Sequence, residues 1–140
     1  MSLYEQYGTD KSLESEGVIL ELGTNKEDGT IIGIRIARAG GGNIRFTKTV
    51  EQRLKPHRHA IQTKTMDREM LDRIMREVYA DTVILGWENV RNRDGSEKPF
   101  NREEVLQLLE ELPELWKQIQ SMSDDISVFR ELERKADAGN

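Results

Sequence analysis

The sequence predicts an α+β fold, with a small N-terminal antiparallel β-meander followed by a helical C-terminal half. Three observations support this prediction. Between positions 17 and 48, apolar residues alternate with other residues in three short stretches, as they do in half-buried strands. From about position 65 to 135 they recur instead at spacings of three and four residues, the pattern of one helix face. A chain of 140 residues with 36% hydrophobic residues is most simply a single domain, 1–140.

The predicted strands lie at Val18 to Leu22, Ile32 to Ile36 and Ile44 to Phe46. Asp28-Gly29 is a turn signal between the first two. Three glycines in a row, Gly40 to Gly42, favour a hairpin turn between the second and the third, because glycine adopts positive φ without steric cost. A phosphate-binding loop would instead need a Gly-Lys-Ser/Thr ending and a helix directly after it.

The longest predicted helix begins at Thr65 as its N-cap, continues to Leu85 and ends at Gly86. Further helices are expected at Thr49 to Leu54, after the N-cap Asn101, from Pro113, and after the N-cap Ser123. In the last of these, Asp124-Asp125 would form a negative first turn, and Ile126, Phe129 and Leu132 would face inward. We expect residues 1–15 and 134–140 to be loosely held.

Charge is distributed unevenly along the chain. The net charge is -5, yet residues 35–64 carry eight basic residues and one acidic residue, a net charge of +7. This basic block could meet nucleic acid or an acidic protein surface, or it could be neutralised by the acidic ends of its own chain or of a neighbouring copy. Phe46 is its only aromatic residue, so the match to an RNA-binding platform is weak. We expect Arg53, Lys55 and Arg58 to contribute to partner binding or assembly.

No pattern in the sequence indicates catalysis, a cofactor or a metal site. The absence of cysteine excludes disulfides, thiolate zinc sites and cysteine nucleophiles. His57 and His59 would point the same way in a strand, but no nearby acidic residue completes a metal site, so we interpret them as surface residues. The paired glutamates after position 102 fit a solvated helix face. No run of 18 apolar residues predicts a membrane span, and residues 1–17 lack the features of a secretory signal.

The stretch YADTVILGWENVRNRDGSEKPFN, residues 79–101, is the most informative part of the chain. Its Trp87 and Phe100 bracket a polar loop, an arrangement that suits presentation of a surface to a partner. Trp87 and Trp116 could each be core or interface residues. We expect Trp116 in the core, because it shares a helical stripe with Ile119, and Trp87 partly exposed and in contact with a partner.

The order GWENV, Asp-Gly turn, PFN, LPELW resembles the small tail assembly chaperones of long-tailed (siphovirus-type) bacteriophages. The similarity continues upstream through GTDKSLESEGVILEL, IRIARAGGGNIRFTK and KPHRHAIQTKTMD, and ends in FRELERKADAGN. The resemblance implies a non-catalytic protein that binds and solubilises the tape measure protein and helps recruit the major tail tube protein. It further implies self-association into open oligomers, location in the cytoplasm of the infected host, and absence from the mature virion.

Two other classes of function remain open. One is a structural tail or connector component of the virion, which would co-purify with mature particles. The other is a nucleic-acid-binding regulator that uses the basic block, whose binding would depend on salt.

Overall fold

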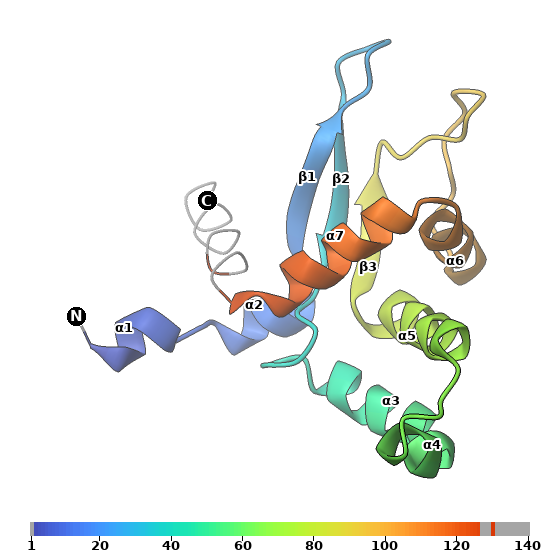
Figure 1. The fold of residues 1–140 in the computed structure, drawn as a ribbon. Helices are drawn as coiled ribbons and strands as arrows, with labels where there is room; N and C mark the ends of the chain where they lie inside the picture. The colour runs from blue at the N-terminus through green and yellow to red at the C-terminus, as the bar shows by residue number, and fades with distance from the viewer. Residues whose placement is uncertain (1, 127–129, 131–140) are drawn as a thin grey trace.

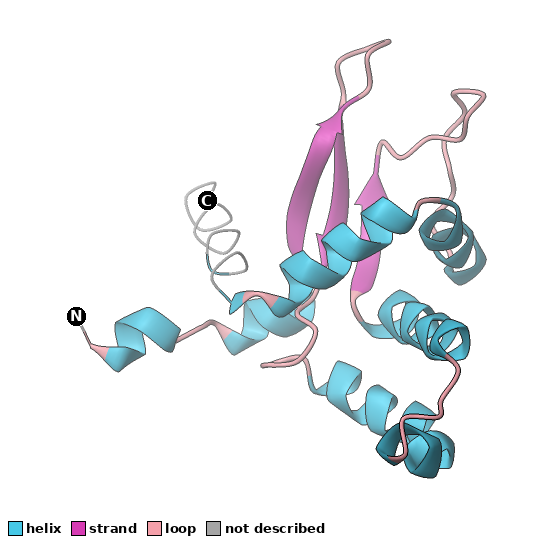
Figure 2. Cartoon of the chain, viewed as in Figure 1, coloured by secondary structure: helices cyan, strands magenta, loops and turns pink. Residues whose placement is uncertain are grey.

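The computed structural model describes residues 2–126 and 130. At its centre is an antiparallel sheet of strand order β1-β2-β3. The strands are β1 (Val18–Thr24), β2 (Ile31–Ile36) and β3 (Ile84–Glu88). The helices are α1 (Leu3–Tyr7), α2 (Lys11–Glu16), α3 (Ile44–Leu54), the 3-10 turn η1 (Lys55–His57), α4 (Arg58–Gln62), α5 (Arg68–Thr82), α6 (Arg102–Glu111) and α7 (Pro113–Asp124). This mixture of a small sheet and helices confirms the predicted α+β class (Figure 2).

The core lies on one face of the sheet. In the antiparallel register Val18 is opposite Ile36, and Leu20 is opposite Ile34, so these four buried side chains share a face. Helix α7 crosses the sheet in Figure 1 and contributes Trp116 and Ile119 to the same hydrophobic cluster. Helix α5 adds Tyr79 to it, in an edge-to-face contact with Trp116 at a centroid distance of 4.8 Å.

The prediction of a third strand at Ile44 to Phe46 is wrong, because these residues begin helix α3. Two apolar residues two positions apart are too few to distinguish a strand from a helix. In the structure Ile44 is 62% exposed, whereas Phe46, Val50 and Leu54 follow one another at helical spacing and are partly buried. The short helix predicted to begin at Thr49 is the second half of this longer one.

The third strand is instead β3, in a stretch where the sequence predicted the end of a helix. Helix α5 ends at Thr82, and Ile34 pairs with Trp87 while Arg35 pairs with Gly86. The β-branched residues Thr82, Val83 and Ile84 have restricted χ1 angles, which makes them better strand residues than helix residues. Gly86 therefore lies inside a strand and does not end a helix.

The glycine loop, residues 39–43, connects β2 to a helix and is not the predicted hairpin turn. A carboxylate of the chain itself lies against it: Glu14 of α2 is 1% exposed and forms an ion pair of 2.6 Å with Arg38. The Gly42 amide donates a 3.3 Å hydrogen bond to Glu14 Oε1, and a Cβ at Gly41 would come within 2.5 Å of Oε2. The loop thus binds an internal anion, which fixes α2 against the end of β2.

The predicted helix boundaries were confirmed where a local signal decides them. The Asn101 side chain accepts a 2.9 Å hydrogen bond from the Glu104 amide at the start of α6, and Pro113 opens α7. Helix α5, however, is capped by Asp67 and not by Thr65.

Ser123 does not begin a new helix. It is buried near the end of α7, and its hydroxyl donates a 2.6 Å hydrogen bond to the Ile119 carbonyl. Asp124-Asp125 therefore lies at a helix C-terminus and not in a negative first turn. The predicted inward residues Phe129 and Leu132, and the tail 134–140, lie outside the described residues.

Candidate functional site

In the connection from β3 to α6 (residues 89–101), residues 89–99 form a loop that backbone hydrogen bonds close, such as the one from the Lys98 amide to the Val90 carbonyl. Asn89 adopts a positive φ of 61°, and its side-chain amide donates a 2.7 Å hydrogen bond to the Ile31 carbonyl. Further along, Arg91 and Glu97 form an isolated antiparallel bridge around a turn at Asp94-Gly95, where Gly95 has φ +90°. The Asp-Gly turn predicted here is confirmed, and its glycine takes a conformation that favours this residue.

Trp87 and Phe100, at the two ends of this loop, pack against each other and are called the aromatic face below. Their ring centroids are 5.1 Å apart with an interplanar angle of 82°, an edge-to-face pair. The indole Nε1 of Trp87 donates a 3.0 Å hydrogen bond to the Lys98 carbonyl, which fixes the ring orientation. Trp87 is half-buried against the edge of the core, while Phe100 is 42% exposed. An oriented aromatic surface is therefore open to solvent.

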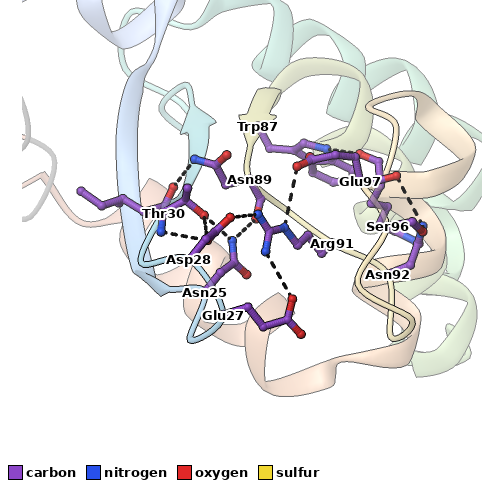
Figure 3. Close-up of polar contacts among 12 residues, drawn as sticks. Asn25, Glu27, Asp28, Thr30, Trp87, Asn89, Arg91, Asn92, Ser96 and Glu97 are labelled. Atoms are coloured by element: carbon purple, nitrogen blue, oxygen red, sulfur yellow. Dashed lines mark hydrogen bonds and ion pairs between the residues drawn. The ribbon is translucent and has the colours of Figure 1, made fainter.

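Beside the aromatic face, Arg91 joins two turns that are distant in the sequence. Figure 3 shows side chains of the β1–β2 turn and of the 89–99 loop converging on its guanidinium group. Arg91 pairs with Asp28, and its nitrogens lie 3.8 Å from Glu27 and 3.7 Å from Glu97. This set of four residues is called the Arg91 cluster below. A single cation flanked by three carboxylates holds the two turns together.

The charges of the Arg91 cluster influence one another. The hydrogen bond from Arg91 lowers the pKa of Asp28 to about 2, and hydrogen bonds from the backbone and side chain of Thr30 act in the same direction. The hydrogen bond to Asp28 correspondingly raises the pKa of Arg91. Both groups therefore remain charged at neutral pH, and the contact between the turns persists there.

Lys98 links the same loop to helix α6. Its side chain is 7% exposed, and its Nζ lies 2.6 Å from the Glu104 carboxylate in the first turn of α6. The Lys98 amide donates a 2.9 Å hydrogen bond to the Val90 carbonyl. Lys98, whose carbonyl accepts the hydrogen bond from the Trp87 indole, is therefore held through both its backbone and its side chain. A buried lysine needs such a partner, because an unpaired buried charge is costly.

The structure brings together only some of the predicted partner-binding residues. Trp87 and Phe100 are in contact, whereas Trp116 is 4% exposed in the core, as expected from its helical stripe. The basic residues lie elsewhere, near the end of α3 and the start of α4. Arg53 forms an ion pair with Glu77 of α5, while Lys55 and Arg58 line a separate groove.

Sequence reasoning missed Arg91 and Lys98. Arg91 lies 63 residues from Asp28 and outside the basic block, so no local pattern marks the pair. Lys98 stands in a polar loop sequence that gives no indication of its burial. Only the Asp-Gly signals at positions 28 and 94 indicated that two turns exist here.

The histidines and carboxylates of the described residues are not grouped as a metal site of three or more such ligands would require. Within 2–126 and 130, no group of three or more His, Asp or Glu side chains is placed to hold a metal ion. His57 and His59 lie in helical turns, where two residues of spacing do not place side chains on the same face. In the same part of the chain, none of the helices has the length and apolar character that a membrane span requires.

Comparison with known proteins places the chain in a family. Residues 41–140 match the family model described as YdaY prophage protein. The chain belongs to this family. The match includes β3, the 89–99 loop, the aromatic face and both C-terminal helices, and it begins after the sheet's first two strands. No curated protein matches the chain, and no solved structure matches it. The protein is therefore phage-related, which agrees with the phage origin implied by the sequence resemblance.

Proposed function

We propose that this YdaY-family protein is a non-catalytic tail assembly chaperone that binds and solubilises the tape measure protein and helps recruit tail tube subunits. Its place in a prophage family supports a phage-related role. The finer role follows from the resemblance carried by GWENV, PFN and LPELW. The chaperone acts in the cytoplasm of the infected host and is absent from the mature virion.

The observation that carries the proposal is the aromatic face. Two of the resembling segments meet there, since GWENV contains Trp87 and PFN contains Phe100. Exposed aromatic rings bury much apolar area on binding, and an edge-to-face pair with a fixed indole loses little conformational freedom. Such a surface suits the apolar stripe of an amphipathic helix in an extended partner.

The supporting structure around the aromatic face is consistent with this role. The Arg91 cluster joins the β1–β2 turn to the 89–99 loop, and the Lys98–Glu104 ion pair joins that loop to α6. The aromatic rings therefore sit on a frame that is braced from two sides. A braced surface binds repeatedly along a long partner without being reordered at each contact.

Coexpression with the tape measure protein of the same prophage tests the proposal. We expect the tape measure protein to become soluble only when the chaperone is present, and the two to co-elute from an affinity column. A chain with Phe100→Ser is the matched variant, because Phe100 is exposed and its replacement should leave the fold intact. A tape measure protein that stays insoluble both with and without the wild-type chaperone would contradict the proposal.

Purified mature particles distinguish the chief alternative. A structural tail or connector protein would be found in them in fixed proportion to the tube subunit. A chaperone should be absent from particles although abundant in the lysate before assembly. Detection of the protein in washed particles at tube-like stoichiometry would establish the structural role instead.

A further inference from the structure

Helices α3 and α4 form an apolar groove with a positively charged rim. Val50 and Leu54 of α3 and Ile61 of α4 line a hollow of about 280 Å³, and Ile61 is 40% exposed. Lys55, Arg58 and Glu51 also line it, so two cations and one anion leave the groove with a net positive charge. We call these residues, with Gln62, the α3–α4 groove.

The two cations of the groove differ from Arg38 and Arg53 of the same basic block. Arg38 pairs with Glu14, and Arg53 pairs with Glu77. Lys55 and Arg58, by contrast, form no side-chain hydrogen bond or ion pair with any residue of the described ranges. Two of the eight basic residues of the block, Arg38 and Arg53, are thus paired with carboxylates of the chain itself. Lys55 and Arg58, which lie beside exposed apolar side chains, are left to pair with something outside the chain.

A second apolar surface, with the opposite charge, lies where α6 meets α7. Leu112, Pro113 and Leu115, together with Leu22 of β1, line a hollow of about 390 Å³, and Leu112 is 44% exposed. Glu111 and Glu114 lie on its rim, and no basic residue lines it. Glu114 is paired only with Lys117, at 3.5 Å between two highly exposed side chains, which neutralises it weakly. We call this surface the α6–α7 corner.

The groove and the corner cannot meet within one chain. Helix α5 packs against α3 on one side and against α6 on the other, so it separates the two surfaces. Figure 1 shows α4 at the lower end of the molecule and the α6–α7 junction well above it. Two surfaces that are complementary in charge and apolar character, yet held apart, fit each other only between copies.

We propose that the α6–α7 corner of one copy docks into the α3–α4 groove of a second copy. Leu112, exposed at the corner, enters the apolar lining formed by Val50, Leu54 and Ile61. Glu111 and Glu114 then face Lys55 and Arg58 across the rim. The inference is independent of the proposed partner protein, because it rests on two surfaces of this chain alone.

This contact determines both the form and the strength of the assembly. Because groove and corner are different surfaces, each added copy leaves one of each unfilled, and the contact propagates into an open chain of copies. A few apolar side chains on each side are less than a stable pair of proteins usually buries, about 1,200–2,000 Å² in total. Single contacts are therefore weak, and charged rims make them weaker at high salt.

Charge exchange tests the contact directly. In the variant K55E/R58E both surfaces are acidic, and in E111K/E114K both are basic. Sedimentation of the wild-type chain at low salt should show a mass that rises with concentration. Each variant alone should associate at least about tenfold more weakly, because like charges oppose the docking. An equimolar mixture of the two should recover association, since every groove then meets a corner of opposite charge.

Matched controls carry the same change of charge at exposed positions away from both surfaces. The pairs K11E/K26E and E5K/E16K, at exposed positions that line neither surface, should associate as the wild type does, and their mixture should show no gain. Thermal melts establish that every variant is folded. If a double variant does not fold, the single variants K55E and E114K, measured alone and as an equimolar mixture, repeat the test.

Three results would overturn the proposal: a wild-type monomer up to millimolar concentration at low salt, charge-reversed variants that associate normally, or a mixture of folded variants that fails to recover. None of these results bears on tape measure binding, because the experiment contains one protein only. Conversely, a failure of tape measure capture would leave the self-association result standing.

Discussion

The two tryptophans occupy regions of opposite character. Trp116 of α7 is 4% exposed and packs in the core beside Tyr79. Its indole Nε1 nevertheless has no hydrogen-bond partner among the described residues. Trp87 is half-buried at the edge of the sheet, and its Nε1 is bonded to the Lys98 carbonyl. The buried ring is thus held by packing alone, and the more exposed ring is held by a directional bond. What covers a tryptophan, and not how well its polar atom is satisfied, separates a core residue from a candidate interface residue.

The largest expected effect is at Trp116. Replacement by alanine, Trp116→Ala, should destabilise the fold by about 3–5 kcal/mol, because it leaves a cavity beside Tyr79 and Ile119. In a chain of this size the melting temperature should fall by on the order of 10 °C. Trp116→Phe, which keeps a large ring, should lose much less. A melting temperature within two or three degrees of the wild type for Trp116→Ala would show that α7 does not close the core.

A smaller effect on stability is expected at Trp87. Trp87→Ala should cost about 1–2 kcal/mol, since the ring is only half-buried. Tape measure capture should weaken by more than about 2 kcal/mol, the loss typical of an interface hot spot. Trp87→Phe retains an aromatic ring but removes the bond to Lys98, so it separates ring area from ring orientation. If Trp87→Ala unfolds the chain, or leaves both folding and capture unchanged, the aromatic face is not a contact surface.

The smallest effect concerns the bracing of the aromatic face by the Arg91 cluster. The pKa of Asp28 is lowered from 3.8 to about 2 in the folded protein, so its carboxylate contributes stability that is present above about pH 4. This contribution should be lost as the pH falls from about 4 to 2, when Asp28 becomes protonated. Melting curves of the wild type and of Asp28→Asn should therefore differ at pH 6 and converge near pH 2. A difference that does not vary with pH would mean that the Asp28–Arg91 pair does not brace the turns.

Elements with a strong local signal could be predicted from the sequence. The strand alternation of Val18 to Leu22, the Asp28-Gly29 turn, the Asn101 cap and the opening of a helix at Pro113 all recur in the structure. Each depends on residues within a few positions of one another. The aromatic face was indicated in part, because the bracketing of a loop by Trp87 and Phe100 predicted their role but not their contact.

Only the tertiary structure decided which stretch completes the sheet and which charges are neutralised. Two short stretches with apolar residues could pair with the free edge of β2, namely Ile44 to Phe46 and Ile84 to Glu88. Which of them becomes the third strand depends on pairing between segments about fifty residues apart. The same holds for Arg91 with Asp28 and for Arg53 with Glu77, whose partners no local period reveals. The sequence by itself determined the fold class, the two Asp-Gly turns and the Asn101 helix cap, because these follow from backbone conformation and short-range hydrogen bonds. Pairing between distant segments follows from the packing of the whole chain, since a strand or an ion becomes stable only when its partner is already in place.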